Sequence, residues 1–97
     1  MRTGIELIAD ERQRQIEMEG YKANHDDYQI YNELTIAAAC YAVNKIVPKI
    51  SVQDINGSDA FPWSDKYDKR DKHDRLRSLV ISGALIAAEI DRLQRDA

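Results

Sequence analysis

The chain has 97 residues, of which 43% are hydrophobic and 32% are charged, and its formal net charge is −3. This composition excludes a disordered chain and a general basic surface for duplex nucleic acid, so we expect one folded domain over residues 1–97. A single cysteine, Cys40, excludes a disulfide framework, and no stretch is apolar enough for a membrane span or a secretory signal, so we expect a cytoplasmic protein without membrane contact.

The first predicted helix spans residues 4–19. Thr3 and Glu6 have the spacing of a capping box, in which each side chain accepts a hydrogen bond from the other residue's backbone amide. Gly20 is placed to end this helix, because glycine readily adopts the left-handed conformation that follows many helices. A turn over residues 21–27 comes next.

The second predicted helix spans residues 28–47, between a cap at Asp26 or Asp27 and the helix-breaking Pro48. A connector over residues 48–71 follows. Glycine and the alternating charge signs in this connector are typical of a loop exposed to solvent.

The last predicted helix spans residues 72–95, where apolar residues recur at helical spacing. Asn56-Gly57, inside the preceding connector, predicts a tight turn. We therefore expect an all-α protein, a three-helix antiparallel bundle with a long connector before its last helix.

Two of the predicted helices carry apolar side chains on two faces. Three helices in a small monomer cannot bury both faces of two of them, so we expect a homodimer or a larger homo-oligomer. The alternative is that the connector folds over the second face. In the last helix, one face comprises Leu76, Leu79, Val80, Gly83, Ile86, Ala87 and Ile90, and the far side comprises Ile81, Ala84, Leu85 and Ala88.

Charged side chains gather at one expected end of the bundle. Acids that converge from separate helices can hold Mg²⁺ or Mn²⁺, and in an enzyme of this kind the metal ligands would be Asp26, Glu33 and Glu89. The alternative is a structural network in which the acids pair with arginines. The residues expected at this end are His25, Asp26, Asp27, Glu33 and Glu89, with Glu11, Arg12 and Arg14 in reach from the first helix and Arg92 from the last.

Aromatic and basic side chains alternate in the connector. Aromatic faces beside cations can stack on a base and hold phosphates. The alternative is that the aromatic side chains pin the connector onto the helices. The residues concerned are Phe61, Trp63 and Tyr67, interleaved with Lys66, Lys69 and Arg70.

Several short, distinct sequence motifs are distributed over nearly the whole chain. They include Glu11-Arg12-Gln13-Arg14-Gln15, Glu19-Gly20-Tyr21, His25-Asp26-Asp27, Glu33-Leu34, Ala37-Ala38-Ala39-Cys40-Tyr41-Ala42, Pro62-Trp63, Arg77-Ser78-Leu79-Val80 and the run from Gly83 to Leu93. Together these motifs resemble a widespread group of small helical proteins encoded by bacteriophages and prophages. The resemblance implies a phage setting in a bacterial cytoplasm, where some small phage proteins sequester nucleotide immune signals.

The acids of the predicted helices are similar to those of the all-helical MazG-like nucleoside triphosphate pyrophosphohydrolases. Those enzymes hold Mg²⁺ with a Glu-x-x-Glu pair on one helix and a Glu-x-x-Asp pair on the next. This chain departs from that pattern, because its second helix offers only Glu33 and its last helix spaces Glu89 and Asp91 two residues apart. An enzyme of this type would use Glu11, Asp26, Glu33 and Glu89.

The leading hypothesis is a helical oligomer that binds a small phosphorylated ligand, most simply a nucleotide. Arg14, Lys69, Arg75 and Arg92 would contact phosphates, and Trp63 or Tyr67 would stack on a base. The alternatives are a Mg²⁺-dependent pyrophosphohydrolase and a non-catalytic protein that binds a host factor. The full set of candidate ligand-binding residues is Glu11, Arg14, His25, Asp26, Asp27, Glu33, Trp63, Tyr67, Lys69, Arg75, Glu89 and Arg92.

Overall fold

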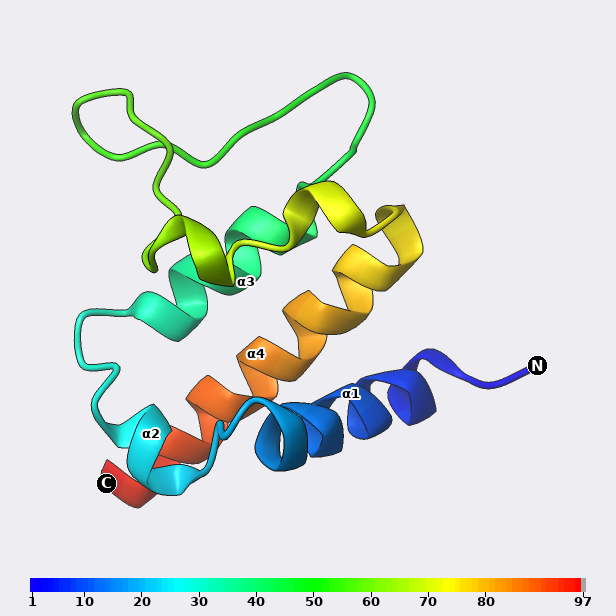
Figure 1. Cartoon of the computed structure of the whole chain (residues 1–97), viewed down its shortest axis with the longest axis vertical. Helices are drawn as coiled ribbons and strands as arrows, with labels where there is room; N and C mark the ends of the chain where they lie inside the picture. The colour runs from blue at the N-terminus through cyan, green and yellow to red at the C-terminus, as the bar shows by residue number, and fades with distance from the viewer. Residues whose placement is uncertain (97) are drawn as a thin grey trace.

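Helices supply the regular structure of residues 1–96, which are the residues that this computed structural model describes (Figure 1). The predicted all-α class is therefore confirmed. Within these residues the β-type pairing is limited to one isolated bridge, between Gln53 and Asp59. The α-helices are α1 (Gly4–Met18), α2 (Ala23–Asp27), α3 (Glu33–Ala42) and α4 (Arg75–Asp96), and short 3₁₀ turns cover Asp65–Tyr67 (η1) and Arg70–Lys72 (η2).

Local signals define helix α1 at both ends. The Thr3 hydroxyl accepts a hydrogen bond from the Glu6 amide at 3.2 Å, and the Glu6 carboxylate accepts one from the Thr3 amide at 2.9 Å, so the predicted capping box is confirmed. The helix ends one residue before the predicted bound. Gly20 follows with a φ of +73°, and the Tyr21 amide turns back to donate to the Gln15 carbonyl at 2.9 Å.

The helix predicted over residues 28–47 is wrong in its bounds, because helix α3 covers only Glu33–Ala42 of this range. Helix α2 forms within the predicted turn and contains Asp26 and Asp27, which are therefore not caps of α3. Asn32 directly precedes α3, and its φ of 66° lies in the left-handed region, so the helical conformation does not continue from α2 into α3.

Helix α3 ends at Ala42, well before Pro48. Lys45 has a φ of 59°, which is incompatible with a continuing α-helix. The Arg75 guanidinium donates to the carbonyls of Ala42 and Asn44, and the Asn44 side chain donates to the Arg70 carbonyl at 2.8 Å. The bond from Arg75 to Ala42 satisfies a carbonyl that the end of the helix leaves free, and the bond from Asn44 ties the chain beyond α3 to the connector.

The tight turn predicted at Asn56-Gly57 is present. Gly57 has a φ of +82°, and the Asp54 carboxylate accepts hydrogen bonds from the amides of Asn56 and Ser58 at 2.8 and 3.0 Å. Helix α4 begins at Arg75, three residues after the predicted start, because the Asp74 carboxylate caps it by accepting from the Arg77 amide at 2.8 Å.

Helix α4 lies at the centre of the fold (Figure 1). Helix α3 runs antiparallel to α4, α1 packs along its other flank, and α2 contacts its C-terminal part. Because α1 and α3 pack on α4 rather than on each other, the arrangement differs from a bundle of three mutually packed helices. No helix within residues 1–96 combines the length and the apolar character needed to cross a membrane.

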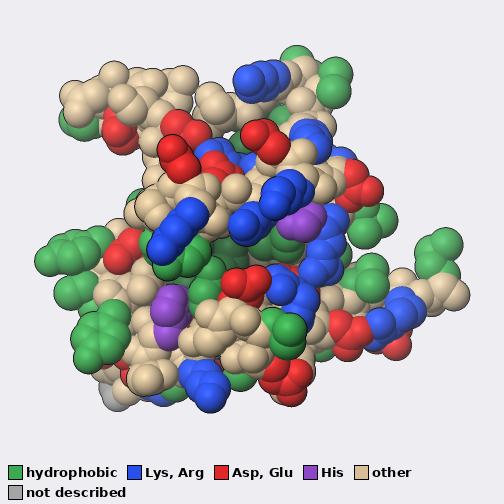
Figure 2. All heavy atoms as spheres, viewed as in Figure 1, with side chains coloured by type: hydrophobic (Ala, Val, Ile, Leu, Met, Phe, Trp, Pro, Cys, Tyr) green, Lys and Arg blue, Asp and Glu red, His purple; other side chains and the backbone are tan. Residues whose placement is uncertain are grey.

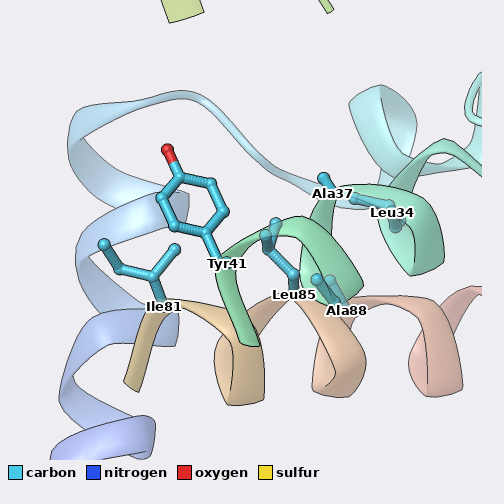
Figure 3. Close-up of a cluster of buried hydrophobic side chains, with 7 residues drawn as sticks. Leu34, Ala37, Tyr41, Ile81, Leu85 and Ala88 are labelled. Atoms are coloured by element: carbon cyan, nitrogen blue, oxygen red, sulfur yellow. The ribbon is translucent and has the colours of Figure 1, made fainter. Parts of the chain in front are cut away.

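The core joins α3 to one face of α4 (Figure 3). Helix α4 buries Ile81, Leu85 and Ala88, which belong to its predicted far side, and leaves Leu79 and Ile90 of the other predicted face exposed. Helix α4 therefore retains an uncovered apolar face in the protomer. The core cluster comprises Leu34, Ala37, Ala38, Tyr41, Ile81, Leu85 and Ala88, with Tyr21, Phe61 and Trp63 packed against it.

Candidate functional site

A small cavity of about 60 Å³ lies between α1, α3, α4 and the connector. Figure 2 shows hydrophobic side chains recessed between charged ones on the face of the molecule seen in Figure 1. The helices supply one side of the cavity, and the chain around η1 and η2 supplies the other. The lining residues are Glu11, Arg14, Gln15, Glu19, Tyr21, Tyr41, Trp63, Tyr67, Lys69, His73, Ile81 and Leu85.

Aromatic rings form much of the wall, and their neighbours hold them in place. Tyr21 stacks on His25 with ring centroids 4.5 Å apart and lies tilted against Trp63 at 6.1 Å. The Trp63 indole N–H donates to the Gln29 side-chain oxygen at 3.0 Å, which ties the connector to the segment that precedes α3. The indole N–H, which is the only hydrogen-bond donor of this side chain, is therefore already engaged.

Tyr41 joins the floor of the cavity to the connector. Its hydroxyl points away from α4 (Figure 3) and accepts a hydrogen bond from the Lys69 amide at 3.1 Å. Burial raises the pKa of Tyr41, and burial likewise raises the pKa of Tyr21 to about 12, helped by the nearby charge of Glu19. Both hydroxyls therefore remain protonated at neutral pH.

Glu11 is buried at the α1 side of the cavity, with only 2% of its surface exposed. Arg14 donates to its carboxylate from Nε at 2.8 Å and from Nη2 at 3.0 Å, and Arg77 of α4 donates to the same group. Burial alone would raise the pKa of Glu11, but the hydrogen bonds and charges of the two arginines outweigh burial and lower this pKa. Glu11 is therefore ionised and fully engaged.

Gln15 lies one turn after Glu11 on the same face of α1 and is also 2% exposed. Its amide nitrogen donates to the Glu11 carboxylate at 3.2 Å. Its Oε1 is buried and has no hydrogen-bond partner among residues 1–96. A buried acceptor without a partner costs free energy.

One unpaired ammonium lies at the rim of the cavity. Arg14 also donates to Glu19 at 3.0 Å, so Arg14 and Arg77 together balance the two acids. The Lys69 ammonium lines the cavity and has no hydrogen bond or ion pair within the described part of the chain. Burial and the charge of Arg77 lower the pKa of His73, so its ring is neutral at pH 7.

Five of the predicted ligand-binding residues meet at this cavity: Glu11, Arg14, Trp63, Tyr67 and Lys69. His25 lies behind the wall, where it stacks on Tyr21. The prediction that aromatic side chains pin the connector onto the helices is confirmed for Phe61 and Trp63, which pack against the core. Trp63 therefore both anchors the connector and lines the cavity.

The remaining predicted site residues lie elsewhere, in structural contacts. Arg12 pairs with the buried Asp26 at 2.9 Å, and Arg92 pairs with Glu89, which also accepts from Thr35 at 3.1 Å. Three others also stabilise backbone or surface geometry: Asp27 binds Arg95, Glu33 accepts from the Tyr31 amide, and Arg75 binds the end of α3. The structural network expected as an alternative is present, since Arg12, Arg14 and Arg92 all pair with acids.

The proposed metal ligands Asp26, Glu33 and Glu89 are not brought together. In residues 1–96 there is no group of three histidine, cysteine, aspartate or glutamate side chains placed to hold a metal ion. The prediction rested on Asp26 as the cap of a helix beginning at residue 28, whereas Asp26 lies within α2 and Glu33 begins α3.

The sequence hypothesis missed Gln15, Tyr21, Tyr41 and His73 as cavity residues. Gln15 had a usable signal, because a polar residue four positions after Glu11 shares its helix face. The other three had none, since their positions depend on how the connector crosses the helices.

A second, larger hollow of about 690 Å³ lies beneath residues 43–53. Its wall includes Cys40, whose pKa is raised by burial, and Arg70, which is engaged by Asp59 and Asp68 at 2.7 and 2.6 Å. The Arg70 guanidinium in this hollow is thus already paired. The smaller cavity is the better candidate site.

Comparisons with protein-family models, with curated proteins and with solved structures gave no match to this chain.

Proposed function

We propose that the protein binds a small anionic ligand with a planar ring, most simply a nucleotide, in the cavity between α1, α3, α4 and the connector. The observation that carries the proposal is the orphaned Oε1 of Gln15 in a cavity with aromatic walls and an unpaired lysine at its rim. A buried acceptor, aromatic faces and a free ammonium together match a donor-bearing ring with an attached anion.

The size of the cavity limits how such a ligand binds. About 60 Å³ admits the edge of one ring, whereas pockets that enclose a drug-sized ligand measure about 300–1,000 Å³. The ring would therefore enter edge-first, with an amino or N–H group donating to Gln15 and its faces against Tyr21 and Trp63. Its phosphates would stay at the rim, near Lys69.

We propose that the protein binds the nucleotide and does not hydrolyse it. Glu11 is the only one of the four acids expected for a pyrophosphohydrolase that lines the cavity, and two arginines and Gln15 already occupy its oxygens. A carboxylate in this state is a poor base and a poor metal ligand. In the phage setting that the sequence resemblance implies, such a protein would sequester a nucleotide signal in the bacterial cytoplasm.

Isothermal titration calorimetry with purified full-length protein tests this proposal. The ligand panel contains linear and cyclic nucleotides, ribose 5-phosphate, free nucleobases and inorganic phosphate. We expect at least one nucleotide to bind more tightly than its base or its phosphate alone, because only the whole molecule reaches both Gln15 and Lys69. Lys69→Gln is expected to weaken that binding about tenfold or more, from the loss of a charged hydrogen bond.

Lys49→Gln is the matched control, since it removes an exposed lysine from the connector outside the cavity. It should leave the dissociation constant unchanged. Absence of binding by the whole panel, or equal effects of the two lysine variants, would overturn the proposal. A protein that captures a host factor would give the first of these results.

We propose in addition that the protein is a homo-oligomer. The support is the apolar surface that α4 leaves uncovered in one protomer, including Leu79, Ile86 and Ile90.

A further inference from the structure

Helix α4 carries a continuous apolar strip on the face opposite the cavity. Ile81 and Leu85 line the cavity, and on a wheel of about 100° per residue the strip lies roughly half a turn away from them. Its five large side chains are between 46% and 63% exposed. The strip consists of Leu76, Leu79, Gly83, Ile86, Ile90 and Leu93.

The spacing along this strip alternates between three and four residues for its whole length. That spacing is the heptad pattern of helices that pack against a second helix, and it extends over about 25 Å. A helix that packs only against its own core requires heptad spacing on one face, whereas α4 has this spacing on a second face as well. The pattern therefore points to another helix as the occupant.

Gly83 does not interrupt the strip. A Cβ atom at this position would lie 2.5 Å from Cδ1 and 2.9 Å from Cγ1 of Ile8, so the Ile8 side chain of α1 occupies the space of the missing side chain. Ile8 is half-buried and thus still reaches the surface. Every position along the strip therefore presents an apolar side chain, with Ile8 of α1 in the place of the missing side chain of Gly83.

The exposed area fits a pair of identical strips. The five large side chains leave on the order of 500 Å² accessible per protomer, and two copies together reach about 1,000 Å², the lower bound for a specific interface. Two copies of the strip therefore supply enough area for an interface without a different partner protein.

Charge selects the antiparallel direction. Residues 72–77 contain three basic and one acidic residue, for a net charge of +2, whereas residues 89–96 contain three acidic and two basic residues, for a net charge of −1. Antiparallel pairing places these opposite ends together and also opposes the two helix dipoles. Parallel pairing would place like ends side by side.

We infer that α4 pairs antiparallel with α4 of a second copy across a two-fold axis, so that Leu79 of each copy faces Ile90 of the other. This inference rests on the proposed self-association and names the surface responsible for it. The two-fold axis passes between Gly83 and Ile86, and Leu76 faces Leu93.

Light scattering coupled to gel filtration tests the surface. The wild-type protein should have twice the chain mass of 11.1 kDa, or a multiple of that value, and Leu79→Glu or Ile90→Glu should shift it to smaller species. Both positions are exposed, so circular dichroism of each variant should remain helical. Ile55→Glu is the matched control, because Ile55 is 99% exposed in the connector and its change should not alter the mass.

Disulfide trapping tests the direction in a Cys40→Ala background. Mixing Leu79→Cys protein with Ile90→Cys protein should give a cross-linked pair under mild oxidation, whereas each alone should not. Cross-links only within each single variant would overturn the antiparallel arrangement.

Three outcomes separate this inference from the proposal of self-association. A monomeric wild type overturns both. An oligomer that Leu79→Glu and Ile90→Glu leave intact overturns pairing through the α4 strip and retains self-association. An oligomer that both variants dissociate, while Ile55→Glu does not, supports both.

Discussion

Two buried polar residues beside the cavity differ in their hydrogen bonding: the Glu11 carboxylate has several donors, and the Gln15 side-chain oxygen has none. Glu11 receives hydrogen bonds from Arg14, Gln15 and Arg77, while Gln15 keeps a free acceptor in the same buried place. The first arrangement stabilises the protomer, and the second costs free energy until a donor arrives. The two residues therefore respond differently to substitution.

Glu11→Gln is expected to lower the free energy of unfolding by about 2–3 kcal/mol. The substitution removes the charge that pairs with Arg14 and Arg77 and leaves two guanidinium groups partly desolvated without it. Urea unfolding followed by circular dichroism measures the effect. Glu17→Gln changes an exposed acid on the same helix and should cost less than about 0.5 kcal/mol. Equal effects of the two variants would contradict the assigned role of Glu11.

The same pair of proteins, wild type and Glu11→Gln, should also differ in pH dependence. Because the folded protein holds the pKa of Glu11 below its ordinary value of about 4.3, Glu11 contributes stability above that value and loses the contribution as the pH falls through the folded pKa. The difference in unfolding free energy should thus be constant near pH 7 and shrink below about pH 4. A difference that grows on acidification would show the opposite pKa shift.

Gln15→Met is expected to separate stability from binding. The variant loses one hydrogen bond to Glu11 but also removes the orphaned acceptor, so the free energy of unfolding should change by less than about 1 kcal/mol. Gln15→Met should weaken the binding of any nucleotide that the proposed calorimetry identifies, because the hydrogen-bond donor of the ring no longer finds the Gln15 oxygen. A large loss of stability with unchanged affinity would instead make Gln15 a purely structural residue.

At the scale of elements, α4 is the support on which the other helices are placed. Ser82 donates to the Ala38 carbonyl at 2.7 Å and thereby holds α3, while Gly83 admits Ile8 of α1. The short side chains on α4 let both neighbours approach closely. The cavity forms because α1 and α3 are held apart on this common support.

Gly83→Ala tests the contact between α1 and α4. In the wild-type background the added methyl group meets Ile8, and we expect a loss of about 1 kcal/mol of unfolding free energy although alanine favours helix. In an Ile8→Ala background the same change should stabilise the protein by about 0.5–1 kcal/mol, because only the helix propensity remains. Thermal or urea unfolding of the four proteins measures this reversal of sign. Equal effects in both backgrounds would contradict the contact.

For the whole molecule, α4 separates two surfaces. The cavity lies on the face that carries Ile81 and Leu85, and the apolar strip with Leu79 and Ile90 lies on the opposite face. The proposed ligand site and the proposed self-association surface therefore involve different side chains of the same helix.

This separation predicts that Leu79→Glu leaves ligand affinity unchanged. The variant should dissociate the oligomer and still bind the nucleotide with a dissociation constant within about twofold of the wild-type value, since no cavity residue changes. Calorimetry at protein concentrations where light scattering shows the smaller species provides the measurement. Loss of binding on dissociation would mean that a second copy completes the site.

Local signals made part of this architecture predictable. Thr3, Glu6 and Gly20 define the ends of α1 through bonds between residues a few positions apart, and the helical spacing of α4 identifies it without tertiary information. The end of α3 had no such signal, because Arg75, far along the chain, donates to its last carbonyl, and Asn44 just beyond it donates to the Arg70 carbonyl. The candidate site was predictable to the same extent, with Trp63 and Lys69 expected and Tyr41 and His73 missed.

The sequence by itself determined the helical class, the ends of the first helix, the tight turn at Gly57 and the presence of more apolar surface than one protomer buries. These features follow from hydrogen bonds and side-chain periodicity within a few residues. Only the tertiary structure decided which face of α4 is buried, which acids pair with arginines and where Gln15 is left with a free acceptor. Those outcomes depend on how the connector and α1 pack against α4, through contacts between residues distant in the chain.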